Sequence, residues 1–314
     1  MHSHLWNRRH CLTVAGAWAT VALSGCASPD KPTATPNPAP PAPIPPPLTR
    51  PPRVGLALGG GAARGFAHVG VIGVLEQQGI RPHCVVGTSA GSLVAALYAS
   101  GKSHAELEKA AQAMEEVVLT DWTLPFANRG MLKGQALSRY VNQQVNHRLL
   151  EQMPLPLGIV ATDLANGQGI LFQRGDTGMA VRASSAVPGV FQPVEIAGRE
   201  YVDGGLVAPV PVHYAQQMGA ELVIAVDISS VPEGNAATDT LKVMLQTFAI
   251  MGQTINRFEL AAAHVVVRPR LSGVGSAAFS ERQRSMAAGR EAMLAALPEL
   301  RAQLLKRSVP VPRG

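Results

Sequence analysis

The sequence predicts a single three-layer α/β/α domain built around a largely parallel central β-sheet. Short apolar runs alternate with segments whose apolar residues recur at helical spacing, as in consecutive β-α units. The run at 221–227 is apolar at nearly every position, which is typical of a parallel strand covered on both faces. Glycine-rich turns follow the first two apolar runs, as expected where a strand passes directly into a helix.

Two β-α units open this pattern. The first has a strand at 54–58, a glycine turn, and a helix over 64–78. The second has a strand that ends at Val86, a turn over 87–91, and a helix over 92–99. We expect helices at 103–117, 134–149, 177–186, 238–263 and 281–306, and strands at 157–162, 170–173, 221–227 and 265–267, with short strands flanking a turn at Gly198.

Composition agrees with a globular domain and excludes several other classes. The chain has 314 residues, of which 46% are hydrophobic, so it can form a sizeable core. Its net charge of +6 is scattered and only 4% of residues are aromatic, which argues against nucleic-acid binding. No C-x-x-C or H-x-x-x-H pattern indicates a metal site, and no cofactor is expected. Cys84 lies in an apolar run and is predicted to be a small core residue, with a catalytic thiol as the minor alternative.

Residues 1–26 have the layout of a lipoprotein signal peptide. Arg8 and Arg9 precede the apolar run 12–23, which is shorter than the roughly 20 residues that a transmembrane helix needs. The L-S-G-C sequence ending at Cys26 resembles a bacterial lipobox, which implies cleavage before Cys26 and lipidation of its sulfur. The alternative is an ordinary signal peptide, and the paired arginines loosely resemble a twin-arginine export signal.

The N-terminal features predict where the protein resides. Acyl chains on Cys26 would hold it at a membrane surface of the bacterial cell envelope. Ala27 is not an acidic retention signal, so resemblance to bacterial lipoproteins favours the outer membrane, on its periplasmic or surface face. Residues 27–52 are rich in Pro, Ala and Thr and predict a semi-rigid linker. A folded domain is therefore expected to occupy residues 53–314.

The strongest chemical signal is the G-x-S-x-G motif from Gly87 to Gly91, with Ser89 at its centre. It lies between an apolar strand and a helix, the context in which this motif presents a nucleophile. A serine at so tight a turn has a strained backbone, and side chains at the two glycine positions would collide with neighbouring elements. The helix that follows would stabilise negative charge developing near Ser89. The alternative is an inactive Gly/Ser-rich turn.

The glycine loop at 59–65 offers main-chain N–H groups to an anion. Such groups suit either a phosphate or a tetrahedral oxyanion. A dinucleotide-binding fingerprint would need glycine at position 64, where Arg64 stands, with Gly65 one place late. Val86 also ends the second strand without the acidic residue that would bind a ribose. Nucleotide binding is therefore not favoured.

Asp203 ends a short strand and is followed by Gly204 and Gly205. An aspartate with small neighbours can accept the proton of a serine hydroxyl. Taken alone, however, Asp-Gly is a common β-turn signal, so this motif has two interpretations.

Together these three blocks resemble the patatin-like phospholipases. The order of glycine loop, G-x-S-x-G and D-G-[GA] is distinctive, and the resemblance runs from about 54 to 227. The segment 182–191 also looks like the block that precedes the catalytic aspartate in that family. The resemblance implies a patatin-like fold and a Ser-Asp dyad without histidine, in which Ser89 attacks an ester carbonyl and Asp203 acts as the base.

The same resemblance assigns the remaining site residues. It implies that an oxyanion is held by main-chain amides, namely those of Gly59, Gly60, Gly61 and Ala90. Arg64, Gly65, Gly87, Gly91, Gly204 and Gly205 support the motifs. The sequence leaves two roles open for Arg64, which are contact with a lipid phosphate and anchoring of the glycine loop.

Other polar residues receive structural interpretations. His68 follows Arg64 by one helical turn, and we do not expect a triad because that helix should run away from the loop. Asp163 and Asp227 each follow an apolar strand and are predicted to bond turns. The apolar stretch from Trp122 to Met131 would suit either an acyl-chain pocket or membrane contact, or simple lid packing.

These features predict a serine acyl hydrolase that cleaves carboxylic esters of lipids. A phospholipid or another lipid ester is the expected substrate, met at a membrane surface, and no nucleic acid is expected as a partner. The alternative is a non-catalytic lipid-binding or scaffold lipoprotein on the same fold.

Overall fold

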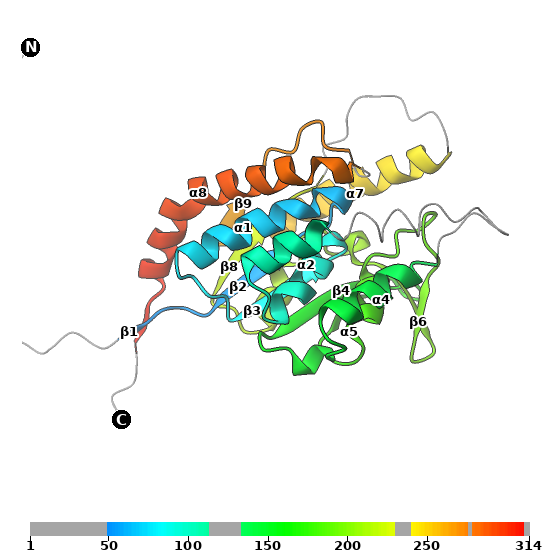
Figure 1. Cartoon of the computed structure of the whole chain (residues 1–314), viewed down its shortest axis with the longest axis horizontal. Helices are drawn as coiled ribbons and strands as arrows, with labels where there is room; N and C mark the ends of the chain where they lie inside the picture. The colour runs from blue at the N-terminus through cyan, green and yellow to red at the C-terminus, as the bar shows by residue number, and fades with distance from the viewer. Residues whose placement is uncertain (1–48, 113–132, 230–239, 276–277, 311–314) are drawn as a thin grey trace, which may run out of the picture. The chain divides into compact units, whose positions relative to one another are not determined.

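A computed structural model describes residues 49–112, 133–229, 240–275 and 278–310. Residues Pro47–Gly314 form one compact unit with its own core, as a domain that folds independently does. Figure 1 shows the order of its helices and strands along the chain.

An eight-stranded sheet forms the centre of the unit. Its strands follow the order β6-β7-β4-β3-β2-β8-β9, and β5 pairs with β4. The pairs β4-β3, β3-β2, β2-β8 and β8-β9 are parallel, whereas β5, β6 and β7 add antiparallel pairs at one end. The strands are β2 (Val54–Leu58), β3 (Cys84–Thr88), β4 (Leu157–Asp163), β5 (Gly169–Phe172), β6 (Val194–Ile196), β7 (Arg199–Asp203), β8 (Leu222–Val226) and β9 (Val265–Val267). The predicted three-layer, largely parallel fold is confirmed.

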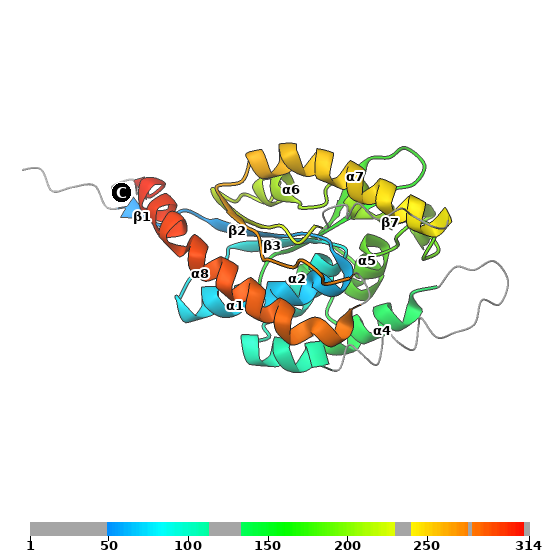
Figure 2. The ribbon, with the colours of Figure 1, turned by 90° about the horizontal axis from the view of Figure 1, so that it is seen from above.

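Helices cover both faces of the sheet, as the view in Figure 2 shows. One face carries α1, α2 and α8, and the other carries α6 and α7. Alternation along each strand supplies both cores, because Leu56 and Leu58 face one hydrophobic cluster while Ala57 faces the other. The helices are α1 (Phe66–Gln77), α2 (Ala90–Ala99), α4 (Gln135–Gln144), α5 (Thr177–Ser184), α6 (Val212–Gln217), α7 (Thr240–Ala261) and α8 (Arg282–Lys306), with a further helix at 104–112.

Local sequence signals explain several element ends. Ser103 and Glu106 form a reciprocal capping box before the helix at 104–112, with the Ser103 N–H donating to Glu106 Oε2 at 2.8 Å. Asp176 caps α5 by accepting the N–H of Met179 at 2.6 Å. Gly198 has φ +74° and turns the chain between β6 and β7, as expected from its position between two short strands.

The start of the described chain lies within the predicted linker. β1 (Thr49–Arg50) pairs antiparallel with β10 (Val309–Pro310) in a separate two-stranded sheet. The Arg50 guanidinium donates two hydrogen bonds of 2.8 Å to Glu221, just before β8. These contacts lower the pKa of Glu221 to about 2, and the hydrogen bond from Arg50 is the largest cause. The chain thus joins the domain before residue 53.

None of the helices in the described ranges is both long and apolar enough to cross a membrane. The predicted signal peptide, with Cys26, and most of the predicted linker lie outside the described residues.

Candidate active site

Ser89 occupies a strained turn between β3 and α2. Its backbone has φ +52° and ψ −123°, a conformation that a residue with a side chain seldom adopts. The turn leaves Ser89 partly exposed at the first turn of α2, while Thr88 before it is fully buried. This is the geometry expected of a nucleophile presented by G-x-S-x-G.

Close backbone contacts explain the two glycines of the motif. A Cβ on Gly87 would lie 2.4 Å from the carbonyl oxygen of Gly91. A Cβ on Gly91 would lie 2.1 Å from the carbonyl oxygen of Leu58, at the end of β2. Neither space can hold a methyl group, so the turn packs tightly against the neighbouring strand only because both positions are glycine. A Cβ on Gly65 would lie 2.9 Å from the Cβ of Ala90, and one on Gly204 would lie 2.2 Å from the carbonyl oxygen of Val160.

Asp203 ends β7, and its side chain is 6% exposed. Its Oδ1 accepts the N–H of Gly205 at 2.7 Å, which fixes the carboxylate at the start of the following turn. Its backbone is held as well, because its carbonyl accepts the Thr162 hydroxyl at 2.8 Å and its N–H donates to Ala186. The Asp-Gly pair is therefore both a turn and a carboxylate held in a defined position.

The surroundings of Asp203 raise its pKa to about 6 from the ordinary value of 3.8. Burial is the main cause, because it disfavours the charged form. The N–H of Gly205 and the hydroxyl of Ser89 act in the opposite direction by favouring the carboxylate. The second oxygen, Oδ2, is buried and makes no hydrogen bond of ordinary geometry among the described residues. The effect of Ser89 places its hydroxyl near the carboxylate, and a raised pKa suits a proton acceptor working near neutral pH.

The glycine loop lies beside Ser89, but only part of it is free to bind an anion. A Cβ on Gly60 would lie 3.1 Å from the Cβ of Ser89, so the loop and the serine are adjacent. The N–H of Gly59 donates to Val226 at 3.0 Å, and that of Gly60 donates to Pro209 at 2.9 Å. Both donors are therefore engaged within the fold, and an oxyanion role for these two amides stays a prediction.

The other two predicted amides, those of Gly61 and Ala90, make no such hydrogen bond in the part of the chain that the structure describes. Among the backbone hydrogen bonds of the described loops and turns, none uses the N–H of Gly61 or of Ala90. Ala90 is the first residue of α2, where helix geometry provides no internal partner for an N–H. The Gly61 and Ala90 amides therefore stay the predicted donors to an oxyanion.

The polar residues given structural interpretations behave accordingly. His68 is fully buried on α1, with Nε2 2.8 Å from the carbonyl oxygen of Gly59. Burial lowers its pKa to about 4, so the ring is neutral and anchors the glycine loop as a donor. Asp163 accepts the N–H of Ala165 and pairs with Arg199 at 3.1 Å, and Asp227 accepts the N–H of Ser229. Both aspartates bond turns, as predicted.

Ser184 is a site residue that sequence reasoning missed. It is fully buried at the end of α5, where its Oγ accepts a hydrogen bond of 2.9 Å from the backbone N–H of Ser89. The same hydroxyl donates to Val160 at 2.6 Å, which fixes its orientation. Ser184 lies in the segment 182–191, which resembles the block before the catalytic aspartate in the family. Its role, however, depends on a contact between residues 95 positions apart in the sequence.

The segment 208–210 is a second missed feature. The carbonyl of Ala208 accepts the Thr88 hydroxyl at 2.8 Å, while that of Pro209 accepts the Gly60 N–H. This segment thus connects the nucleophile turn to the glycine loop. No motif marks it in the sequence.

The remaining predicted residues are placed as follows. Cys84 is fully buried in β3, and burial raises its pKa to about 11, so it is the core residue expected. Arg64 is partly buried in the 3-10 turn before α1, and its two possible roles stay open. The apolar stretch from Trp122 to Met131 lies outside the described residues. No cluster of three or more metal-binding side chains occurs in the described ranges.

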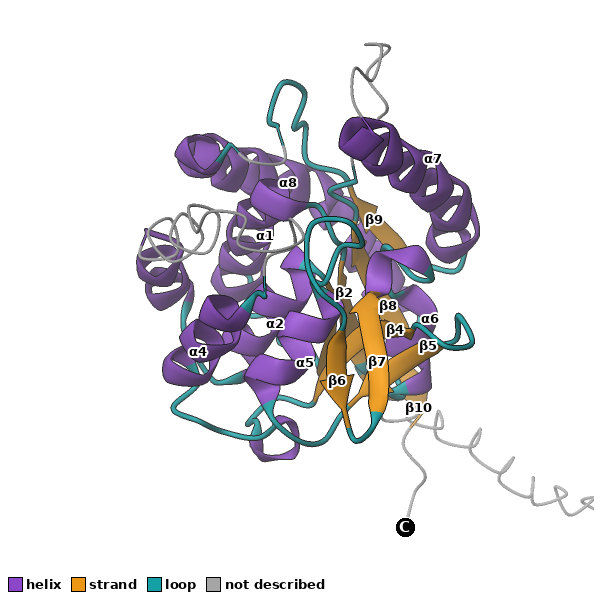
Figure 3. Cartoon of the chain, turned by 90° about the vertical axis from the view of Figure 1, so that its right-hand side faces the viewer, coloured by secondary structure: helices purple, strands orange, loops and turns teal. Residues whose placement is uncertain are grey.

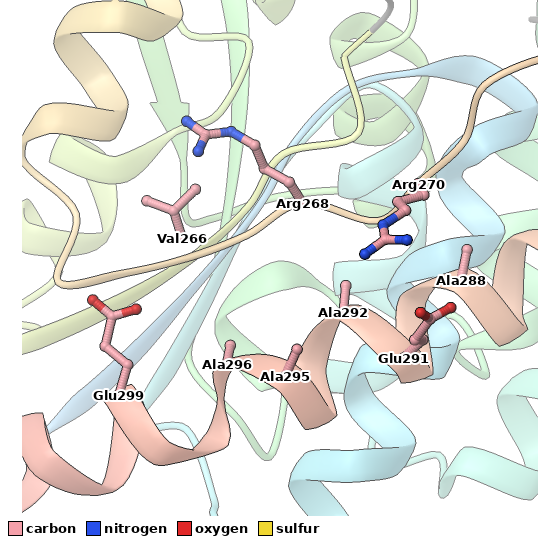
Figure 4. A pocket seen from close by; sticks show the side chains of 9 residues that line it. All are labelled: Val266, Arg268, Arg270, Ala288, Glu291, Ala292, Ala295, Ala296 and Glu299. Atoms are coloured by element: carbon pink, nitrogen blue, oxygen red, sulfur yellow. The ribbon is translucent and has the colours of Figure 1, made fainter.

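An open groove of about 320 Å³ lies away from this site, between β9 with its following segment and α8 (Figure 4). Arginines stand on the strand side and glutamates on the helix side, with alanines between them. None of its lining residues belongs to the predicted active site. The volume of a groove therefore does not by itself identify the active site here. The lining residues are Val266, Arg268, Arg270, Ala288, Glu291, Ala292, Ala295, Ala296 and Glu299.

The fold and site define a class, namely α/β proteins with a strained serine turn after one strand and a buried aspartate at the end of another strand of a mostly parallel sheet. A family model described as "Patatin-like phospholipase" matches residues 56–215, slightly more than half of the chain. The chain belongs to the patatin-like phospholipase family.

Several curated proteins are similar in sequence. An uncharacterized NTE family protein of Mycobacterium tuberculosis is 37% identical over 185 residues, covering 59% of this chain and 51% of that protein. Patatin-like phospholipase domain-containing protein 6 of mouse is 32% identical over 191 residues, covering 59% of this chain and 14% of that protein. The match thus spans about half, or less, of the length of these relatives.

Solved structures give weaker likenesses. VipD from Legionella pneumophila has a TM-score of 0.47 at 15% identity, covering 80% of this chain and 67% of that chain. ExoU from Pseudomonas aeruginosa, in complex with SpcU, has a TM-score of 0.44 at 16% identity, covering 82% and 54%. The family assignment therefore depends on the sequence match.

Proposed function

We propose that the protein is a serine acyl hydrolase that cleaves carboxylic esters of lipids, with Ser89 as nucleophile and Asp203 as base. The observation that carries the proposal is the strained Ser89 beside a buried carboxylate whose pKa is about 6. Family membership supports a lipid substrate, such as a phospholipid or another lipid ester.

The proposed reaction has two halves. Ser89 Oγ attacks the ester carbonyl carbon as its proton passes to Asp203, and the tetrahedral intermediate expels the alcohol, which takes that proton. Water then attacks the acyl-serine while Asp203 accepts its proton. Collapse of the second intermediate releases the carboxylic acid and returns the proton to Ser89. The carboxylate thus acts as base and then acid in each half.

The two available amides support the charge that develops. Gly61 N–H and Ala90 N–H would donate to the oxyanion of each intermediate, and the positive end of α2 lies beneath it. His68 contributes indirectly, because its neutral ring holds the Gly59 carbonyl and so the shape of the loop.

Hydrolysis of a series of p-nitrophenyl acyl esters tests the proposal. We expect turnover by the fragment 47–314, which keeps Arg50, and loss of at least about 10³-fold in Ser89→Ala and Asp203→Asn. His68→Gln is the matched control, because it keeps a donor near Gly59 but cannot act as a base. Fluorophosphonate labelling should follow Ser89. A folded wild type with neither turnover nor labelling would instead favour a lipid-binding scaffold.

We further propose that the mature chain is anchored through lipidated Cys26 in the bacterial cell envelope, with the outer membrane favoured. The L-S-G-C sequence, the apolar run before it and Ala27 after it support this proposal. Palmitate labelling of the full chain in a Gram-negative host tests it. Cys26→Ala should abolish labelling, and Cys11→Ala should not. Labelling that persists in Cys26→Ala would refute the anchor.

A further inference from the structure

Helix α7 buries two polar side chains and exposes several large apolar ones. Among its described side chains the buried ones are polar, namely Asn256 and Glu259. Several of its large apolar side chains are exposed, with Phe258 77% and Ile250 52% exposed, while others, such as Leu260, are half-buried. A helix that packs on a core normally shows the reverse. The exposed apolar side chains of α7 are Val243, Leu245, Ile250, Met251 and Phe258.

Polar contacts hold α7 in this orientation. Asn256 accepts the N–H of Val210 at 3.2 Å and donates to Ser229 at 2.8 Å. Glu259 accepts the N–H groups of Val212 and His213 at the start of α6, and it also contacts the His213 ring. These bonds fix Asn256 and Glu259 inward, so the exposed apolar side chains of the helix are directed outward by the fold itself.

The outward face forms one continuous stripe, the α7 stripe, at a spacing of three or four residues. Its two threonines do not present free hydroxyls, because Thr247 donates to the carbonyl of Val243 at 2.9 Å and Thr254 to that of Ile250 at 3.4 Å. Threonine methyl groups therefore continue the apolar surface. The α7 stripe consists of Val243, Thr247, Ile250, Thr254 and Phe258.

The α7 stripe belongs to a helix that borders the proposed active site. Gly252 of α7 faces Pro209, since a Cβ built on it would lie 3.5 Å from Pro209 Cγ. Pro209 accepts the Gly60 N–H, and the neighbouring Ala208 accepts the Thr88 hydroxyl. Figure 3 shows α7 at the margin of the described structure, beyond the sheet. Because Ile250 and Thr254 each lie two positions from Gly252, the stripe is on the side of α7 that faces away from Pro209, so a surface that met it would contact the outer side of a helix whose inner side borders the site.

We infer that the α7 stripe docks on an anionic lipid surface. The charges of the helix are complementary to such a surface, because the exposed charged side chains of α7 among its described residues are Lys242 and Arg257, both basic. The acidic Glu259 is buried and held by α6. This contact is separate from the anchor at Cys26, and its benefit to lipid hydrolysis rests on the proposed function.

Flotation of the fragment 47–314 with lipid vesicles tests the contact without the N-terminal segment. We expect partitioning into phosphatidylcholine vesicles that contain phosphatidylglycerol. The double variant Ile250→Gln/Phe258→Gln should partition about tenfold less, because two exposed apolar contacts are lost. The double variant Leu294→Gln/Leu305→Gln replaces a similar exposed apolar pair on α8 and should partition as wild type does.

Charge is tested by changing the lipid. Arg257→Gln should weaken partitioning about fivefold with phosphatidylglycerol and leave the weak partitioning on phosphatidylcholine alone unchanged. Wild type and the α7 double variant should hydrolyse a soluble short-chain ester at equal rates, whereas hydrolysis of vesicle phospholipid should fall in the α7 variant.

Three results would overturn the inference. They are a wild-type fragment that does not float, an equal loss in the α7 and α8 double variants, and a dimer in analytical ultracentrifugation that the α7 variant dissociates while flotation is unchanged. The last result would assign the stripe to a second copy of the chain. If the wild-type fragment does not hydrolyse the soluble ester, the proposed function is refuted. Flotation would still test membrane binding by the α7 stripe.

Discussion

Asp203 must be buried and yet ionised for the proposed chemistry. Burial raises its pKa to about 6, and the Gly205 N–H and Ser89 hydroxyl limit that rise. Between pH 3.8 and 6 the folded state therefore binds more protons at this site than the unfolded state does, so stability falls as pH rises through this range. Activity should change in the opposite sense, because only the carboxylate accepts a proton.

The rate of ester hydrolysis should report this carboxylate directly. We expect kcat/KM for an uncharged ester to rise with pH along an acidic limb whose apparent pKa is near 6. Initial-rate assays from about pH 4 to about pH 8, roughly two units either side of the expected pKa, would define this limb. A limb near pH 4 would show that Asp203 is not desolvated during catalysis.

Removing the charge should stabilise the fold. Asp203→Asn should raise the free energy of unfolding at pH 8, by at most about 3 kcal/mol, because the buried charge is lost. The gain should shrink below pH 6 and vanish near pH 4, where wild type is itself protonated. Urea unfolding at these pH values measures it. A variant less stable than wild type at pH 8 would contradict a costly carboxylate.

At the scale of elements, the strained turn at Ser89 depends on the end of α5. Ser184 links the Ser89 N–H to the Val160 carbonyl of β4, and Ala186 accepts the Asp203 N–H two residues later. One short segment therefore positions both members of the proposed dyad. The link explains why α5 and β7 must pack beside α2 for the site to form.

Ser184→Ala should damage the site without removing a reacting group. We expect the free energy of unfolding to fall by about 1–3 kcal/mol, because a buried N–H and a buried carbonyl lose their partner. Misplacement of Ser89 should lower kcat about tenfold with little change in KM. Ser185→Ala, at a half-buried neighbour, is the matched control. Equal effects of both variants would argue against a positioning role.

At the scale of the whole molecule, α8 completes the domain by packing on α1. A Cβ on Gly289 would lie 1.9 Å from the Ala67 carbonyl oxygen, and one on Gly70 would lie 1.9 Å from that of Met286. The two helices thus approach backbone to backbone at a glycine from each. This packing covers the α1 face of the sheet and gives the C-terminal part of the chain a structural role.

Gly289→Ala should therefore be destabilising even though alanine favours helices. We expect a loss of about 2 kcal/mol or more in the free energy of unfolding, because overpacking exceeds the gain in helix propensity. Gly275→Ala, where a Cβ meets nothing within 4 Å, should stay within about 0.5 kcal/mol of wild type. Thermal and urea unfolding would distinguish the two. A stable Gly289→Ala would show that α1 and α8 can separate.

Sequence pattern predicted the elements well where one periodicity dominates. The strand at 265–267 was placed at its observed bounds, and the buried strand β8 fell within the predicted 221–227. The antiparallel additions of β5, β6 and β7 were not distinguished, because alternation within a strand does not show which neighbour it pairs with. The pairing of β1 with β10 was not predicted either, since it joins residues about 260 positions apart.

By itself the sequence determined the fold class, the tight turn at Ser89 and the candidate aspartate, because glycine spacing and apolar runs are local signals. Only the tertiary structure decided which glycine amides remain available, since Val226 and Pro209 occupy those of Gly59 and Gly60. It also decided the roles of Ser184 and the outward face of α7. These depend on contacts between residues that are far apart in the sequence, and local sequence patterns do not specify such contacts.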